Sequence, residues 1–175
     1  LRNPAEGPSH QRLALLEREV TRMQEILQSY LSSCRPPEVM ATARVHLGRL
    51  VSETLLVLSA RADAAGVRLS SRGDAFVEGD PRRLEEALVN LVANGIEATP
   101  PGGEVVVGVR QDSDRIEILV RDTGCGISPE TLSRLGTPFF TTREEGTGLG
   151  VALARSTIAW HGGSLSYESE PGKGT

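Results

Sequence analysis

The stretch from Glu86 to Thr99, EALVNLVANGIEAT, constrains the fold of this chain more than any other. On a helix with about 100° per residue, Glu86, Asn90 and Asn94 form one polar stripe. The apolar residues lie on the other side of the same helix: Leu84, Ala87, Leu88, Leu91 and Val92. Asn is a poor helix former because its side chain competes for backbone hydrogen bonds. The two amides therefore either bind a ligand or belong to an ordinary solvated surface, and the helix by itself leaves both open.

Composition narrows the class of protein. The chain has 175 residues, 38% of them hydrophobic, and a net charge of −4, which suits one α/β domain with an appendage. No long basic run is present, so we expect no nucleic-acid partner. Cys34 and Cys125 are far apart and have no metal-ligand neighbours, which favours a reduced, cytoplasmic setting. No run approaches the ~18 apolar residues of a membrane span and no signal peptide is visible, although a longer parent protein could be soluble or membrane-anchored.

Residues 1–36 have a pattern of their own. After a loop over residues 1–8, apolar residues recur at spacings of three and four: Leu13, Leu16, Val20, Met23, Leu27 and Tyr30. This heptad pattern predicts a long helix over 9–34, which needs a partner helix or a second chain to bury its apolar side. Pro36 and Pro37 end the helix and mark the domain boundary.

Residues 37–175 alternate between strand and helix patterns. Strands are predicted over 41–45, 67–71, 75–78, 104–110, 115–121 and 164–170, and helices over 47–65, 81–98, 128–135 and 148–160. Asp80 and Pro81 are the expected N-cap and first residue of the second helix, and residues 136–147 are predicted to be a mobile loop. The order predicts an α/β two-layer sandwich, a mixed sheet with helices on one face.

Three segments at junctions of these elements carry the chemistry. Gly146–Gly150, GTGLG, opens a helix, where glycines allow close approach and free N–H groups bind phosphate. Asp122 closes a strand before a Gly-x-Gly turn and can present a carboxylate to an amino group. The side-chain oxygen of Asn94 suits Mg²⁺, which prefers few protein ligands, phosphate oxygens and water. Together the segments predict a site for Mg²⁺ and a nucleotide.

Other nucleotide-binding motifs do not fit the sequence. A Walker A pattern ending at Gly172 and Lys173 needs glycine where Tyr167 stands, and a dinucleotide-binding pattern from Gly146 needs glycine where Val151 stands. Each of the two glycine segments alone is more often a simple turn, and any one of the three segments alone is a weak signal. Their joint occurrence in this order is the more specific observation.

The same segments resemble a known family. NLVANGIEAT, DTGCG, PFFTT and GTGLG are similar to the N, G1, F and G2 boxes of the GHKL ATPases, and more narrowly to the catalytic domain of sensor histidine kinases of two-component systems. HGGSLSYESEPGKGT is similar to the usual ending of that domain, so the resemblance covers about residues 40–175. It implies the Bergerat fold, in which ATP lies under a flexible lid.

The resemblance also implies roles for individual residues. Asn94 would bind Mg²⁺, Asn90 would lie beside the phosphates, and Asp122 would accept a hydrogen bond from the adenine amino group. Residues 136–147 would form the lid, packed down by Phe139 and Phe140, with Thr141, Thr142 and Arg143 as candidates to reach the phosphates. The catalytic candidates are Asn90, Asn94 and Arg143. Further nucleotide contacts are implied for Gly124, Gly126, Ile127, Gly146, Thr147, Gly148, Leu149 and Gly150.

Two positions depart from the usual pattern of the family. Gly95 stands where Ala is usual after the second Asn, and it should loosen the helix by roughly 1 kcal/mol. Glu97 stands where many members carry Lys or Tyr, which puts in doubt any basic phosphate contact from this helix. His161 is expected to be structural because it ends a helix.

Asn90 separates two branches of the superfamily. In the superfamily that the chain resembles, the hydrolysing branches (gyrase, the Hsp90 chaperone and MutL) have Glu at the position of Asn90. This Glu acts as the general base that activates water. An amide cannot take a proton near neutral pH, so ATP should be kept for transfer to a protein group. Phosphoryl transfer then depends on positioning and charge stabilisation by Mg²⁺ and the lid.

The expected acceptor is a histidine on a dimerisation helix hairpin. Residues 1–8 would be its interhelical loop and residues 9–34 its second helix, so the acceptor would lie upstream. LRNP at residues 1–4 also resembles the end of the phosphoacceptor motif, but too little helix follows it, and His10 lacks the following acidic residue. Expected partners are ATP, a second kinase subunit through the heptad helix and a response-regulator receiver domain. The alternatives are an anti-sigma-type Ser kinase and a non-catalytic nucleotide-binding module.

Overall fold

The structure is a computed structural model that describes residues 13, 16–21, 23–24, 41–143 and 146–175. The chain divides into two units, Leu1–Arg35 and Pro36–Thr175. In the first unit the described residues are helical, and their large apolar side chains are exposed: Leu13, Leu16, Val20 and Met23. The rest of the predicted heptad helix lies outside the described residues. Within the described part of the chain, no helix combines the length and apolar character needed to cross a membrane.

The strands of the second unit form two small sheets, where the sequence predicted one. β1 (Ala43–His46) pairs antiparallel with β3 (Phe76–Gly79), so that Ala43 lies opposite Gly79. β4 (Glu104–Asp112) lies between β2 (Arg68–Arg72), to which it is parallel, and β5 (Arg115–Asp122), to which it is antiparallel. Between β2 and β3 the chain turns at Gly73, whose φ of +79° favours glycine.

Local sequence sets the ends of the two long helices as predicted. α2 (Leu47–Ala65) begins after His46, whose side chain accepts a hydrogen bond from the Arg49 N–H, and ends at Gly66 with φ of +67°. α3 (Pro81–Ala98) begins after Asp80, whose carboxylate accepts from the N–H groups of Arg82 and Arg83. These caps satisfy N–H groups that have no partner inside the helix.

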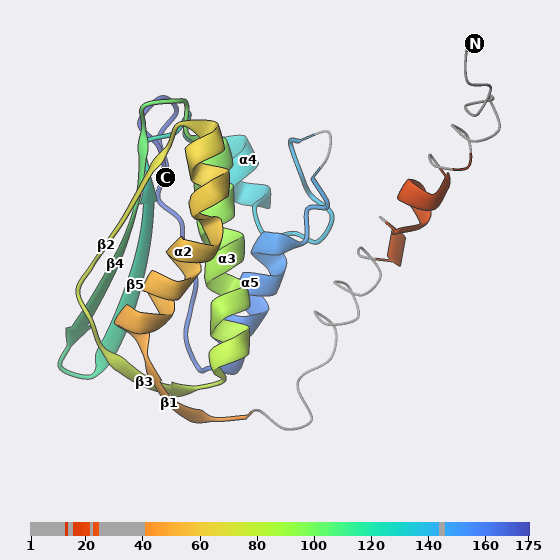
Figure 1. Cartoon of the computed structure of the whole chain (residues 1–175). Coiled ribbons are helices and arrows are strands. Elements are labelled where there is room, and N and C mark those ends of the chain that lie inside the picture. Colours follow the sequence, from red (N-terminus) through yellow and green to blue (C-terminus); the bar gives the residue numbers. More distant parts are fainter. Residues whose placement is uncertain (1–12, 14–15, 22, 25–40, 144–145) are drawn as a thin grey trace, which may run out of the picture. The chain divides into compact units, whose positions relative to one another are not determined.

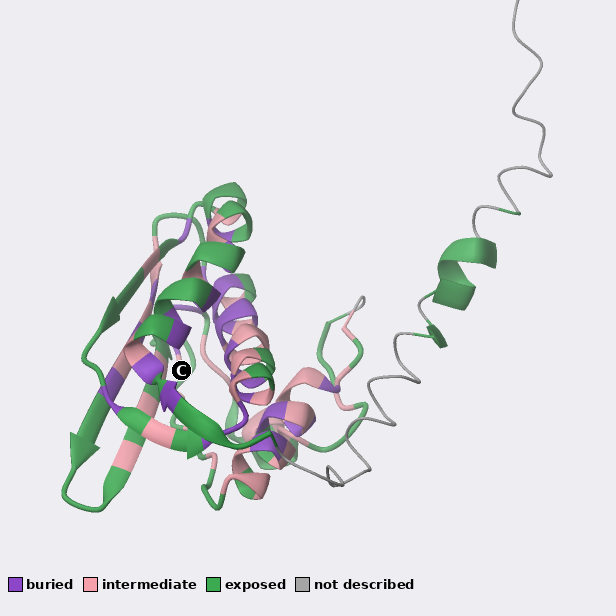
Figure 2. Ribbon diagram, turned by 60° about the horizontal axis from the view of Figure 1, so that its bottom comes forward, coloured by how far each residue is buried: buried purple, intermediate pink, exposed green. Residues whose placement is uncertain are grey.

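The helices cover one face of the three-stranded sheet. Figure 1 shows α2 and α3 over β2, β4 and β5, with α5 (Gly150–Trp160) beside α3. The buried sides of α2 and α3 face the sheet, as Figure 2 shows. The largest fully buried apolar side chains come from α2, α3 and β4 and from the residue before α5: Leu47, Val51, Val92, Ile96, Val105, Val107 and Leu149. The predicted α/β class, with helices on one face of a mixed sheet, is therefore confirmed (Figure 1).

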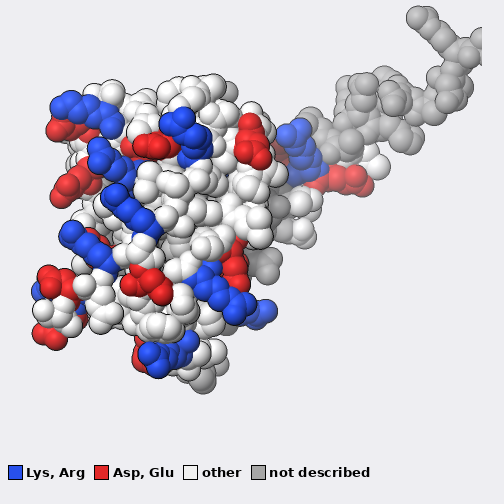
Figure 3. All heavy atoms as spheres, turned by 60° about the vertical axis from the view of Figure 1, so that its left-hand side comes forward, with Lys and Arg blue, Asp and Glu red and all other residues white. Residues whose placement is uncertain are grey.

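The opposite face of this sheet is open to solvent. Figure 3 shows arginine and acidic side chains interspersed over it. Some of them pair across strands, as Arg110 does with Glu117 (2.5 Å) and Arg68 with Glu104 (3.8 Å). Such exposed pairs contribute little to stability, so the fold depends on the helix-covered face.

Several predicted boundaries differ from those of the structure by one to two residues, among them the ends of β1, β2 and β3. The β4–β5 ladder continues to Asp112 opposite Arg115, so only Ser113 and Asp114 form the turn instead of four residues. A two-residue turn with positive φ fits the right-handed twist of the strands, and the φ of Ser113 is +32°. α5 begins at Gly150 and not at Gly148, because the φ of Gly148 is +68°. The short helix α4 (Pro129–Arg134) ends one residue before its predicted end.

Residues 164–170 do not form the predicted strand. Leu165, Tyr167 and Ser169 are half-buried and alternate with exposed residues, as in a strand. The segment makes only an isolated bridge, between Glu170 and Gly174. Alternation of apolar and polar residues determines which side chains are buried. A strand also needs hydrogen bonds to a neighbouring strand, and none of the described strands pairs with this segment.

His161 has the structural role predicted for it. Its Nε2 accepts a hydrogen bond from the Asp80 N–H (2.9 Å), and its Nδ1 lies 2.7 Å from the Thr157 carbonyl oxygen. Both ring nitrogens are thus used by the backbone. The side chain joins the end of α5 to the start of α3.

Tyr167 carries the one buried polar side-chain atom that finds no hydrogen-bond partner among the described residues. Burial raises the pKa of Tyr167 to about 12, although the nearby Arg155 acts in the opposite direction. We predict that Tyr167→Phe raises the free energy of unfolding by about 1 kcal/mol near neutral pH, since it removes an unsatisfied hydroxyl.

The sign of the pH dependence follows from the raised pKa. An unfolded Tyr ionises near pH ~10, so the wild type should lose stability as the pH rises from about 10 to 12. Denaturant unfolding of both proteins over this range measures the difference. An equal alkaline loss in Tyr167→Phe would contradict the role given to this hydroxyl.

Candidate functional site

Asp122 lies at the end of β5 and is buried on the helix-covered side. Only 6% of its surface is exposed, whereas its neighbours Arg121 and Thr123 are exposed, as expected from the alternation of a strand. Its Oδ1 accepts hydrogen bonds from the N–H groups of Gly124 (2.8 Å) and Thr175 (3.3 Å). The carboxylate is thus held in place by backbone donors.

The turn after Asp122 requires glycine. A Cβ on Gly124 would lie 2.4 Å from the Ala98 carbonyl oxygen, and the Cys125 N–H donates to that same oxygen (3.0 Å). Gly126 has φ of +67°, and a Cβ there would lie 2.0 Å from the Glu170 carbonyl oxygen. The DTGCG segment is therefore pressed against the C-terminal end of α3. The next residue, Ile127, is half-buried, and its N–H donates to the Ser169 hydroxyl (2.8 Å).

The second glycine segment meets the other end of the polar stripe on α3. Asn90 is half-buried, and its Oδ1 lies 3.1 Å from the position that a Cβ on Gly150 would take. Leu149 is fully buried and anchors the start of α5, and its N–H donates to the Thr147 hydroxyl (3.4 Å). No side chain caps this helix, so its first N–H groups remain for a phosphate.

The predicted lid is described over 136–143 and 146–147. At Gly148 the backbone before α5 lies directly against the lid backbone at Phe139. A Cβ on Gly148 would lie only 2.5 Å from the Phe139 carbonyl carbon, so this close approach requires glycine. Arg134 lies over the ring of Phe140 (4.1 Å), and 53% of the surface of Phe139 is exposed. Thr141 and Thr142 are exposed, and the Thr141 hydroxyl accepts from the Arg143 N–H (3.0 Å).

Arg143 lies against α3. Its Nη1 donates to Asn94 Oδ1 (3.1 Å), its Nη2 donates to the Asn94 carbonyl oxygen (3.2 Å), and the guanidinium also pairs with Glu97. Glu97 pairs in addition with Arg61 of α2. In the sequence, Glu97 was notable only because many family members carry a basic residue at this position. Its pairing with Arg143 and Arg61 was not predicted. Its position one turn after Asn94 was a usable signal, but nothing in the sequence pointed to Arg61.

The structure thus gathers the predicted residues along α3. Asn90 meets Gly150, Asn94 meets Arg143, and Asp122 with Gly124 lies at the C-terminal end of the helix. For Thr142, predicted to contact the phosphates, the structure shows only that the residue is exposed. No group of three or more His, Cys, Asp and Glu side chains in the described part of the chain could hold a metal.

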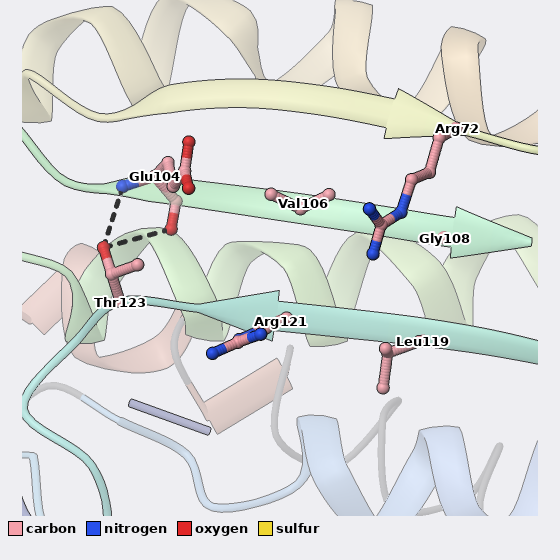
Figure 4. A pocket seen from close by; sticks show the side chains of 7 residues that line it. All are labelled: Arg72, Glu104, Val106, Gly108, Leu119, Arg121 and Thr123. Atoms are coloured by element: carbon pink, nitrogen blue, oxygen red, sulfur yellow. Dashed lines mark hydrogen bonds between the residues drawn. The ribbon is translucent and has the colours of Figure 1, made fainter. Parts of the chain in front are cut away.

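A hollow on the other side of the sheet contains none of these residues. It has a volume of about 250 Å³ and is lined by Arg72, Glu104, Val106, Gly108, Leu119, Arg121 and Thr123. Figure 4 shows that these residues come from β2, β4 and β5 and from Thr123 just after β5. Asp122 lies between Arg121 and Thr123 and therefore points to the opposite face. The candidate nucleotide site is therefore on the helix-covered face.

Comparison with known proteins agrees with this geometry. Residues 79–175 match the family described as histidine kinase-, DNA gyrase B- and HSP90-like ATPases. The chain belongs to this family. The match begins at the last residue of β3 and includes α3, both glycine segments and the lid.

Relatives place the chain within the family. The sensor histidine kinase ZraS of Klebsiella oxytoca is 33% identical over 177 residues, which cover 99% of this chain and 38% of ZraS. The chain thus spans about two fifths of that curated relative. Because sensor histidine kinases match nearly its whole length, the chain is the catalytic ATPase part of a kinase of this type.

Two solved structures share the fold. Full-length ShkA, solved in complex with AMPPNP, has a TM-score of 0.82 and 22% identity, over 98% of this chain and 38% of ShkA. ThkA, solved in complex with the response regulator protein TrrA, has a TM-score of 0.75 and 23% identity, over 99% of this chain and 50% of that chain.

The close contact between Gly124 and α3 gives a prediction. Gly124→Ala should lower the free energy of unfolding by about 1–3 kcal/mol, because its Cβ would overlap the Ala98 carbonyl oxygen and force the turn away from α3. The matched control is Gly108→Ala, whose Cβ would meet no atom closer than 3.8 Å and should change stability by less than about 0.5 kcal/mol. Denaturant unfolding measures both; equal effects would show that the turn can adapt.

Proposed function

We propose that this domain transfers the γ-phosphoryl group of ATP to a histidine on a dimerisation helix hairpin, for relay to an aspartate of a response regulator. The observation that carries the proposal is Asn90 beside the start of α5. The side chain facing the expected phosphate position is a neutral amide that cannot activate water by taking its proton. This supports transfer to a protein group over hydrolysis.

Asp122 is the proposed adenine ligand. It is buried at the end of β5, and its backbone donors among the described residues, Gly124 and Thr175, both bind Oδ1, so Oδ2 remains for an amino group. Gly124, Gly126 and Ile127 would form the walls of this end of the site. The triphosphate would lie along Gly146, Thr147, Gly148, Leu149 and Gly150, at the start of α5.

Asn94 is the proposed Mg²⁺ ligand. Its Oδ1 already accepts a hydrogen bond from a cation, the Arg143 guanidinium, so a positive charge is accommodated at this oxygen. An amide oxygen with phosphate oxygens and water is a donor set that suits Mg²⁺. Bound there, the ion would neutralise charge on the phosphates, while Asn90 and the lid residues Phe140, Thr141, Thr142 and Arg143 would position them.

The proposed partners are ATP, a second kinase subunit that pairs through the heptad helix, and a receiver domain. The solved complexes of ShkA with AMPPNP and of ThkA with TrrA support the first and the last. We propose a domain boundary between residues 36 and 37, with the dimerisation hairpin before it, and a cytoplasmic location as for two-component kinases.

Phosphate labelling tests the reaction. Mixed with Mg²⁺ and γ-labelled ATP, this chain should label a longer form of the protein that carries the dimerisation hairpin, and the label should be acid-labile and base-stable. Acid-stable label would point to a Ser kinase of the anti-sigma type. ATP binding without any label would point to a nucleotide-sensing module.

The adenine assignment has its own test. Asp122→Asn should weaken ATP binding roughly ten- to hundredfold, because a hydrogen bond to a charged acceptor is lost while the Oδ1 contacts can remain. Asp112→Asn, at the exposed end of β4, is the matched control and should bind ATP as the wild type does. Calorimetric titration measures both, and unchanged affinity in Asp122→Asn would refute the assignment.

A further inference from the structure

Four side chains form a connected polar cluster between α2, α3 and the lid. Arg143 donates to both oxygens of Asn94 and pairs with Glu97, and Glu97 pairs with Arg61. The side chain of Glu97 is 32% exposed and that of Arg143 40%, so water screens these contacts only in part. Glu97 is thus the only acidic residue in this cluster of described side chains, and it joins the lid to the body of the domain.

Arg143 occupies the oxygen atom of Asn94 that is proposed to bind the metal ion. Its Nη1 binds Asn94 Oδ1, the same oxygen that we assign to Mg²⁺. A guanidinium and a metal ion carry the same sign of charge and cannot share one side-chain oxygen at bonding distance. Arg61 carries the same charge and pairs with the same carboxylate, but the side-chain hydrogen bonds described for Asn94 come from Arg143.

We infer that Arg143 and Mg²⁺ compete for Asn94 Oδ1, and that Glu97 is a positioning residue that holds Arg143 there. Nucleotide with Mg²⁺ then binds only as the guanidinium leaves the oxygen, so this contact sets the Mg²⁺ concentration at which nucleotide binds. The inference rests on the proposed role of Asn94 in metal binding. It adds a function for Glu97, which the sequence motif leaves without one.

The test measures ADP binding by calorimetry at a series of free Mg²⁺ concentrations and records the midpoint in Mg²⁺. ADP is the probe because it lacks the γ-phosphate, which excludes any contact between Arg143 and that group. Arg143→Met should lower the midpoint about three- to fivefold, as expected from the loss of a partly exposed charged contact. An unchanged or raised midpoint would overturn the inference.

Arg61→Met is the matched control. It removes the same charge from the same carboxylate but leaves the contact between Arg143 and Asn94, so its midpoint should stay within about twofold of the wild type. If Arg61→Met lowered the midpoint as much as Arg143→Met, net charge and not competition would explain the effect. The competition would then be refuted.

A double-mutant cycle tests Glu97. In a Glu97→Gln background, Arg143→Met should lower the midpoint less than it does in the wild type, because Arg143 is no longer held on Asn94. An undiminished effect would refute the role of Glu97. A wild type whose ADP binding shows no dependence on Mg²⁺ would instead refute the metal assignment itself, and the inference with it.

Discussion

The close packing of α3 between the sheet and α5 is the constraint on which the rest of this domain depends. On the sheet side Gly95 fits closely, since a Cβ there would lie 3.3 Å from Val105 and 3.5 Å from the Asp122 side chain. Gly124 and Gly150 allow close approaches at two other contacts of the helix, where a Cβ would lie 2.4 Å from the Ala98 carbonyl oxygen and 3.1 Å from the Asn90 side chain. Without side chains at these two glycines, the turn after β5 and the start of α5 can both lie against α3. A Cβ on Gly124 would overlap the Ala98 backbone and move the DTGCG turn away from the helix.

This packing gives meaning to the polar stripe of α3. Asn90 and Asn94 are half-buried, so they are neither core residues nor part of a freely solvated surface. Each amide lowers helix stability slightly, and the helix tolerates them because its other side is buried in an aliphatic core. A sequence that breaks a local rule in this way, without a packing reason, marks a functional position.

The sequence predicted what depends on local pattern and missed what depends on contacts between distant segments. Helix ends at Asp80 and Gly66 follow from capping chemistry, and the motif residues at element junctions were found because each carries its own pattern. Residues 164–170 show the limit, since alternation cannot tell whether a neighbouring strand pairs with them. The pairing of Glu97 with Arg61 joins residues 36 positions apart and follows from no periodicity.

The neutral side chain at position 94 is consistent with an exchange between two cations. A carboxylate there, one turn from Glu97, would hold the Arg143 guanidinium in charge-assisted bonds about twice as strong as those to an amide. Two adjacent carboxylates would also repel each other whenever the lid moved away. With Asn94 the oxygen is available to a cation, and among the described residues the charge that pairs with Arg143 is that of Glu97. In the competition that we propose, a metal ion that brings its own anionic ligands, the phosphates, would release Arg143 from this oxygen.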